Sequence, residues 1–188
     1  LDFLAPYRIP GSFAVTPVNI EDEQPRFFYE DKVLLQAIRS GQADGHEFFQ
    51  HGTTHEGIEN GISDPRMYQL MGRSASYDVT RRRQFYDHYW SYEAIRAQID
   101  WGRRAWMEGS GKPAEGFRPG GLCFCQNMYR ALEDLGFKWC SCDLVSMTGR
   151  MWGAGQWDYP VEFEPPYLPY KRYGETVEIP VLDDVAFK

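Results

Sequence analysis

Short apolar runs alternate with amphipathic runs along the first part of the chain. Residues 12–16 and 47–51 are short and rich in residues that favour strands. Between them, the apolar residues of 31–40 recur at helical spacing, and Gly41 is expected to cap that helix. The acidic and polar stretch 19–30 predicts a loop. A strand, a helix and a second strand in this order are typical of a βαβ unit.

The alternation resumes in the second half of the chain. The elements predicted there are helices over 90–108 and 126–135, strands over 116–121, 137–145 and 176–181, and a long loop over 149–173. Residues 1–7 resemble the end of a helix. Because strands alternate with helices, we expect an α/β protein with a mainly parallel sheet or barrel.

Residues 63–90 interrupt this pattern with arginines among aromatic side chains, including the run Arg81-Arg82-Arg83. We expect an insertion here in a single domain spanning 1–188. Aromatic and arginine side chains together are typical of a sugar-stacking or partner surface. The alternative is a loop and helix that pack on the domain through their aromatic side chains.

Length and charge narrow the classes of function. The 188 residues carry a net charge of −7, with 43% hydrophobic and 25% charged residues, which is typical of a globular domain. The acidic balance argues against a nucleic-acid partner, because such proteins bind phosphates with basic side chains. No apolar run approaches the length of about 18 residues that would predict a membrane span.

Two of the four histidines lie four residues apart, just after a predicted strand. His51 and His55 could bind one metal ion at this spacing. In βα folds, functional residues are concentrated at the carboxyl ends of strands, which favours this interpretation. The alternative is that both side chains only form hydrogen bonds at the strand end and at a helix cap.

The four cysteines form two Cys-x-Cys pairs, whose members are Cys123, Cys125, Cys140 and Cys142. Alternate residues of a strand share a face, so Cys140 and Cys142 should point the same way. Three states stay open: small buried core residues, disulfides, or a four-cysteine metal site.

Residues 45–55 read Gly-His-Glu-Phe-Phe-Gln-His-Gly-Thr-Thr-His. This run resembles the second motif of the polysaccharide deacetylase (NodB homology, carbohydrate esterase family 4) superfamily. The resemblance implies that His51 and His55 bind a catalytic divalent metal, expected to be zinc. Gly52 stands where the family usually has Ser or Thr.

Residues 117–121, Phe-Arg-Pro-Gly-Gly, resemble the family's third motif, which forms one side of the active-site groove. The resemblance implies that Arg118 orients the catalytic carboxylate, and that Phe117, Pro119 and Gly120 lie against the substrate. Without the family, the favoured interpretation is that Arg118 pins a strand end through a buried carboxylate. The runs 1–15 and 177–184 also resemble the family. The resemblance therefore spans nearly the whole chain, with the exception of the insertion at 63–90.

The resemblance implies a distorted (β/α) barrel of the NodB type. The family's first motif, Thr-Phe-Asp-Asp, supplies the base and a third metal ligand, and its last motif, Leu-x-His, supplies the acid. Neither motif occurs in residues 1–188, and we expect them to precede Leu1 and to follow Asp184. The chain is therefore expected to be part of a longer domain, with little activity of its own.

The implied activity is that of a metal-dependent hydrolase cleaving a C–N amide bond. The first candidate reaction is N-deacetylation of an amino-sugar polysaccharide such as chitin or peptidoglycan. Hydrolysis of a small cyclic amide, as in the allantoinase-like branch, is one alternative. A non-catalytic carbohydrate-binding module is another. The sequence leaves homo-oligomerisation open.

Overall fold

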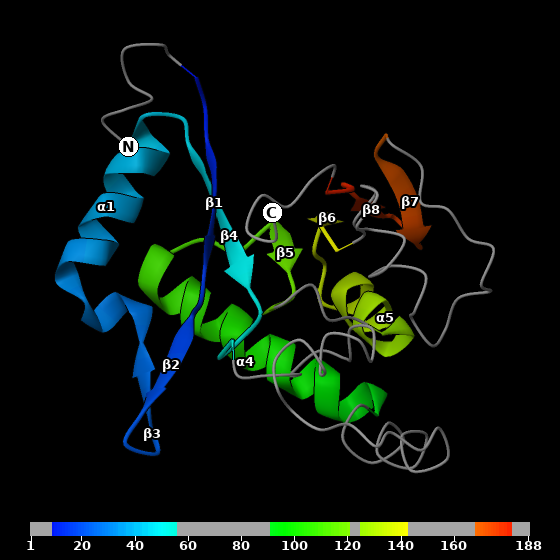
Figure 1. Ribbon diagram of the computed structural model, residues 1–188, viewed down its shortest axis with the longest axis horizontal. Coiled ribbons are helices and arrows are strands. Elements are labelled where there is room, and N and C mark those ends of the chain that lie inside the picture. The colour runs from blue at the N-terminus through cyan, green and yellow to red at the C-terminus, as the bar shows by residue number, and fades with distance from the viewer. Residues whose placement is uncertain (1–8, 56–90, 121–124, 143–167, 182–188) are drawn as a thin grey trace, which may run out of the picture.

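A computed structural model describes residues 9–55, 91–120, 125–142 and 168–181, and all structural statements concern these residues. A six-stranded sheet forms the centre (Figure 1). In spatial order its strands are β1 (Ser12–Val15), β4 (Glu47–His51), β5 (Gly116–Arg118), β6 (Trp139–Cys140), β8 (Thr176–Glu178) and β7 (Tyr170–Tyr173). Neighbouring strands pair in parallel from β1 to β8, and only β7 is antiparallel. The mainly parallel α/β architecture predicted from the sequence is confirmed.

In the described part of the chain, three helices lie between these strands. They are α1 (Lys32–Ala43), α4 (Tyr92–Ser110) and α5 (Gln126–Asp134). Asp31 caps α1, because its carboxylate accepts hydrogen bonds from the backbone N–H groups of Val33 and Leu34 at 2.9 and 3.1 Å. The helix continues through Gly41, so the predicted cap at Gly41 is wrong. At the end of α4, Gly111 adopts the left-handed conformation, with φ 76°.

Two predicted loops contain strands. Within 19–30, strands β2 (Val18–Glu21) and β3 (Gln24–Phe27) form an antiparallel hairpin, followed by the short 3₁₀ helix η2 (Phe28–Glu30). Asp22 and Glu23 both have positive φ, as a tight two-residue hairpin turn requires. Because both residues are acidic and neither is glycine or asparagine, the sequence did not indicate this turn. The second is β7, at the end of the predicted loop 149–173.

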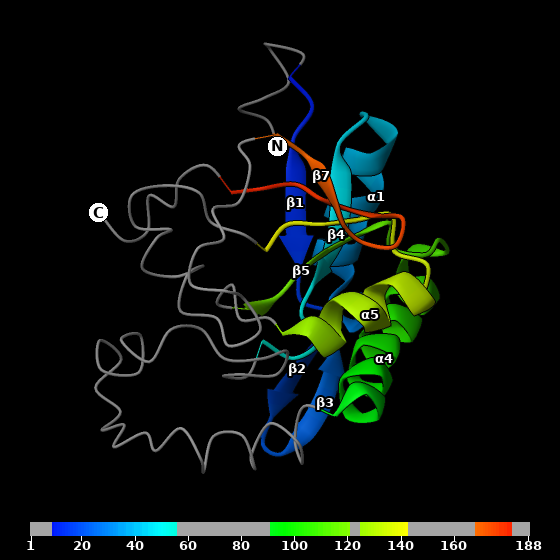
Figure 2. The same ribbon diagram turned by 90° about the vertical axis from the view of Figure 1, so that its right-hand side faces the viewer.

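All three helices cover the same face of the sheet (Figure 2). Their apolar sides bury a core against β4, β5 and β6, and the largest fully buried side chain there is Trp106 of α4. Phe28 stacks on Trp106 with ring centroids 5.3 Å apart, which fastens η2 to the same core. No described helix has the length and apolar character needed to cross a membrane.

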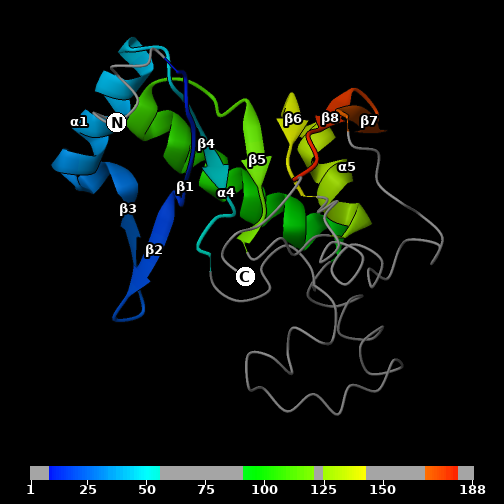
Figure 3. The same cartoon turned by 45° about the horizontal axis from the view of Figure 1, so that its top comes forward.

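Figure 3 shows β1, β4, β5, β6, β8 and β7 side by side. Side chains of a strand alternate between its two faces. In β4, Gln50 points to the helices, since its amide donates a hydrogen bond to the carbonyl of Ile99 in α4 at 3.3 Å. The neighbouring positions Phe49 and His51 therefore belong to the opposite face.

Several predictions fall outside the described residues. These are the helix end at 1–7, the insertion at 63–90, the remainder of the loop up to 167, Cys123, Gly121 and the aspartates at 183 and 184. The predicted strand over 137–145 is represented by β6, and residues 143–145 lie outside the described part.

Candidate functional site

The candidate site begins where β4 and β5 end side by side. His51 is the last residue of β4 and pairs in register with Arg118, the last residue of β5. The Arg118 carbonyl lies 3.1 Å from Nδ1 of His51 and accepts a hydrogen bond from the backbone N–H of Gly52 at 2.7 Å. Because a carbonyl only accepts, Nδ1 of His51 carries the proton and Nε2 keeps its lone pair.

A sharp turn after β4 brings the second histidine back to the first. Gly52 and His55 both adopt the left-handed conformation, with φ 56° and 57°. The imidazole rings of His51 and His55 lie with their centroids 4.7 Å apart and tilted by 54°. The structure thus brings together the two histidines that the sequence spacing singled out. A left-handed histidine is uncommon and is found where the surrounding structure holds it.

His51 is held in its neutral form. Burial lowers its pKa from 6.5 to about 4, and the neighbouring His55 and the charge of Arg118 act in the same direction. The hydrogen bond to the Arg118 carbonyl opposes this shift. Neutral imidazole is the form of histidine that binds metal ions. His55 is exposed, so the pair reaches solvent on one side.

Helix α4 supports the turn between His51 and His55, which we call the histidine turn. The buried Gln50 amide donates to the carbonyl of Gly52 at 2.9 Å, and the buried Thr53 hydroxyl donates to the carbonyl of Gln98 at 2.9 Å. Gly102 lets the helix approach this closely. A Cβ at that position would lie 2.4 Å from Nε2 of Gln50 and 2.9 Å from Oγ1 of Thr53.

The Arg118 side chain lies on the same face as His51. Its Nη2 donates a hydrogen bond to the hydroxyl of Ser141 at 2.8 Å, and its guanidinium carbon lies 5.9 Å from the ring centroid of Phe49. Within the described part of the chain, its Nε–H is buried and has no hydrogen-bond partner. A buried guanidinium N–H of this kind is suited to bind a carboxylate.

The other residues of the third motif have different surroundings. Phe117 is fully buried and packs edge-on against Phe137 at 5.6 Å, on the helix side of the sheet. Pro119 and Gly120 are also buried. The predicted contact of these three residues with substrate stays a prediction.

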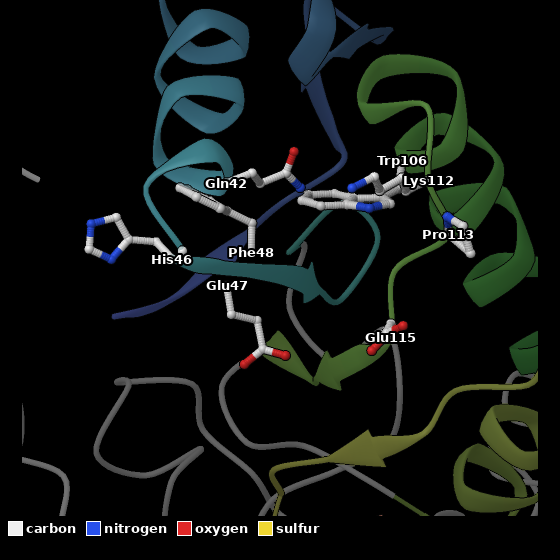
Figure 4. Close-up of a pocket in the computed structure, with 9 residues that line it drawn as sticks. Gln42, His46, Glu47, Phe48, Trp106, Lys112, Pro113 and Glu115 are labelled. Carbon is white, nitrogen blue, oxygen red and sulfur yellow. The ribbon is translucent and has the colours of Figure 1, made fainter. Parts of the chain in front are cut away.

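A separate cavity of about 410 Å³ lies at the opposite end of β4 (Figure 4). Its lining includes Glu47, Phe48, Trp106 and Lys112, but not His51, His55 or Arg118. Figure 4 shows Phe48 on the side of Trp106 and Glu47 on the other side of the strand. His51 lies four positions after Glu47, which corresponds to about 13 Å along the strand. The cavity is therefore distinct from the histidine site.

Sequence reasoning did not single out Ser141 or Gln50 as contributors to this site. Ser141 lies 23 positions from its partner Arg118, and no local pattern connects them. Gln50 lies within the second motif, but Glu47 and His51 of the same strand are polar too, so its residue type gave no distinctive signal.

Comparison with known proteins identifies the family. The sequence model of the polysaccharide deacetylase family matches residues 1–140, which is more than half of the chain. The chain therefore belongs to the polysaccharide deacetylase family, as the motifs around His51 and Arg118 indicated. A search of curated protein sequences finds no match.

One solved structure agrees in fold, and two further matches are weaker. A candidate polysaccharide deacetylase from Mycobacterium smegmatis is 19% identical over 96% of this chain, with a TM-score of 0.56. A cobalt-bound family 4 acetyl xylan esterase from Clostridium thermocellum is 15% identical over 77% of the chain, with a TM-score of 0.43. A carbohydrate esterase family 4 pseudoenzyme from Bacillus anthracis is 13% identical over 72% of the chain, with a TM-score of 0.46.

This chain covers 43%, 49% and 34% of those three structures, respectively, so it spans less than half the length of each. The fold is the NodB type of α/β barrel expected from the motifs. Among the described residues its sheet is open, with β1 and β7 at the edges.

Proposed function

We propose that this chain provides metal-binding residues of an active site that hydrolyses a C–N amide bond. The proposed reaction is N-deacetylation of an amino-sugar polysaccharide. The observation that carries this proposal is the pairing of a neutral His51 with His55 beside Arg118, at the carboxyl ends of two parallel strands. Membership of the polysaccharide deacetylase family supports the same reaction class.

The histidines fit a divalent metal, and zinc is the ion that we propose. The N–H at Nδ1 of His51 donates a hydrogen bond to the Arg118 carbonyl, which leaves Nε2 as the metal-binding atom. His51 and His55 would supply two ligands, and the family's first motif would supply a third. When bound, such an ion lowers the pKa of a water molecule and polarises the substrate carbonyl.

Arg118 serves the site in two ways. Its backbone carbonyl fixes the ring orientation of His51. Its side chain keeps a buried N–H available for a carboxylate. In the proposed site this carboxylate is the base of the family's first motif, which removes a proton from the attacking water. The guanidinium would hold it in the ionised, proton-accepting form.

Elemental analysis of the purified chain tests the metal assignment. We expect a zinc equivalent that His51→Ala removes. His46→Ala is the matched control, because Nδ1 of His46 accepts a hydrogen bond from the Gly11 backbone N–H at the opposite end of β4. Equal metal content in the parent and in His51→Ala would contradict the assignment.

Acetate release from chito-oligosaccharides, assayed on the full-length protein, tests the reaction. We expect acetate in proportion to the zinc bound at His51. Hydrolysis of a cyclic ureide without acetate release would replace the polysaccharide with a small cyclic amide. Binding of chito-oligosaccharides without turnover of either substrate would make the protein a non-catalytic carbohydrate-binding module.

A further inference from the structure

Two cysteines and a glutamate form a compact buried cluster on β6 and β8. Cys140 pairs in register with Glu178, and Cys142 follows two residues after Cys140. One ligating atom from each of the three side chains lies within 4.8 Å of the others. Cys140, Cys142 and Glu178 are at most 1% exposed. We refer to these three residues as the Cys-Glu cluster.

Specific contacts hold the carboxylate of Glu178 between the two cysteines. The Cys140 thiol donates a hydrogen bond to Oε2 at 3.0 Å, and the backbone N–H of Cys142 donates to Oε1 at 2.7 Å. A carboxylate is costly to bury unless it is paired, hydrogen-bonded or bound to a metal. Core packing alone accounts for small buried thiols, but it does not account for a glutamate placed between them.

The chemistry of this donor set selects a thiophilic cation. Thiolate sulfur and carboxylate oxygen bind zinc at about 2.3 and 2.0–2.2 Å. In a tetrahedral complex these bond lengths separate the ligand atoms by about 3.5–3.8 Å. The ligand atoms of the Cys-Glu cluster already lie within 4.8 Å of one another, so small side-chain movements would bring them to these separations. We propose that Cys140, Cys142 and Glu178 form a second metal site, of the zinc or cadmium class.

Binding there exchanges protons for the metal ion. The two thiols each release a proton, including the one that Cys140 donates to Glu178, and the two thiolates and the carboxylate coordinate the cation. No electron transfer is involved. The carboxylate accepts hydrogen bonds before binding and donates an electron pair to the metal afterwards.

A disulfide between Cys140 and Cys142 is less compatible with this backbone. The chain is extended here, since the N–H of Ser141 donates to the carbonyl of Phe117 and the N–H of Cys142 reaches Glu178. Extended residues two apart have Cα atoms about 6.6 Å from each other, close to the upper limit for disulfides. A bond would also leave Glu178 without its thiol donor.

The Cys-Glu cluster is distinct from the histidine site but is linked to it by one residue. Ser141 lies between the two cysteines and points to the opposite face, where its hydroxyl accepts the hydrogen bond from Arg118. The cysteines belong to the buried core that also contains Met128 and Leu132 of α5. A metal bound by the Cys-Glu cluster would therefore fix the segment that holds Arg118 in place.

Titration of the metal-free, reduced chain with Cd²⁺ tests the proposal, because cadmium–thiolate bonds absorb in the ultraviolet and cadmium–histidine bonds do not. We expect this absorption to saturate at one equivalent. Cys142→Ser should remove at least half of it, and Glu178→Gln should weaken Cd²⁺ binding at least tenfold. Cys125→Ser is the matched control and should leave the signal unchanged, as should His51→Ala.

X-ray absorption spectroscopy of zinc-loaded His51→Ala, which should lack the zinc of the histidine site, reports the ligands of the cluster zinc with all cysteines in place. Two sulfur ligands at about 2.3 Å would support the assignment. Four sulfur ligands would assign the metal to all four cysteines and overturn it. The absence of cadmium–thiolate absorption would also overturn it. So would a Cys140–Cys142 disulfide in the purified protein, which mass spectrometry would detect as a loss of two hydrogens.

The test of the Cys-Glu cluster can fail or succeed independently of the test of the proposed hydrolase. His51→Ala reports on the histidine site, whereas thiolate absorption reports on the Cys-Glu cluster. If no zinc equivalent of the parent depends on His51, the assignment of the Cys-Glu cluster still stands. Absence of thiolate absorption would leave the histidine assignment intact.

Discussion

The carbonyl oxygen of Arg118 lies 3.1 Å from Nδ1 of His51, while the Arg118 side chain turns to the hydroxyl of Ser141. One residue thus orients a metal-ligand candidate through its backbone and presents a guanidinium through its side chain. These two contributions can be separated by mutation, because a substitution at position 118 changes the side chain and leaves the carbonyl in place.

Arg118→Lys should lower kcat of the full-length protein about 100-fold while leaving bound zinc unchanged. Lysine keeps the charge but loses the planar set of N–H donors that orients a carboxylate, and small misplacements of a catalytic group can cost about two orders of magnitude. Steady-state acetate release and elemental analysis measure the two effects. Loss of the zinc together with the activity would show that the side chain supports the metal site itself.

Ser141→Ala should destabilise the protein by about 1–3 kcal/mol, because it leaves an N–H of Arg118 without its acceptor in a partly buried position. Ser141→Thr keeps the hydroxyl and should restore most of the stability. Urea denaturation followed by circular dichroism measures both variants. A free energy of unfolding equal to that of the parent in Ser141→Ala would mean that this hydrogen bond contributes nothing.

Gly102→Ala should weaken zinc binding at the histidines. The added Cβ meets the buried ends of Gln50 and Thr53, which support the turn between His51 and His55. Overpacking of this kind costs about 1–3 kcal/mol. Competition with a coloured chelator measures the zinc affinity, which we expect to fall at least tenfold.

Gly109→Ala is the matched control for that substitution. It lies in the same helix, and its Cβ would come equally close, 2.4 Å, to Cζ of Phe28. We expect similar destabilisation without a change in zinc affinity, because Phe28 lies in η2 and not in the histidine turn. An equal loss of affinity in both variants would indicate a general loosening of the fold.

Glu133 should contribute stability that depends on pH. Its carboxylate accepts hydrogen bonds from the Thr176 hydroxyl at 2.6 Å and from the backbone N–H groups of Glu175 and Thr176. The Thr176 hydroxyl and then the Glu175 N–H lower the pKa of Glu133 below its ordinary value. Folding therefore favours the carboxylate, so the contribution is present above the unfolded pKa and is lost as pH falls through the folded one.

Glu133→Gln should accordingly cost about 1 kcal/mol at pH 7, with solvent screening keeping the loss small. The difference from the parent should begin to shrink as the pH falls below about 4.3, the ordinary pKa of a glutamate, and should vanish once the parent carboxylate is protonated at its lowered pKa. Glu115→Gln is the control, because Glu115 forms an exposed ion pair with Lys138. Thermal unfolding across this pH range measures both. A difference that grows at low pH would contradict the assignment.

Local patterns predicted much of the sheet and its helices. The strand over 47–51 coincides with β4, and the helix over 126–135 ends within one residue of α5. The helix has clear periodicity and is followed by Gly136, and the strand is flanked by Gly45 and Gly52. The hairpin at β2 and β3 was missed because its turn uses Asp22 and Glu23 in the left-handed conformation, which is a role that glycine and asparagine usually indicate. Strand β7 was missed because it pairs only with β8 at the sheet edge.

By itself, the sequence determined that His51 and His55 lie at the end of one strand with metal-ligand spacing and that Arg118 belongs to another strand. These are local facts, fixed by short-range periodicity and by motif. Only the tertiary structure decided that β4 lies beside β5 and β6 beside β8, which places Arg118 against His51 and Glu178 against Cys140. Strand order and register depend on pairing between distant segments, and Glu178 is 38 positions away from the cysteine that it contacts.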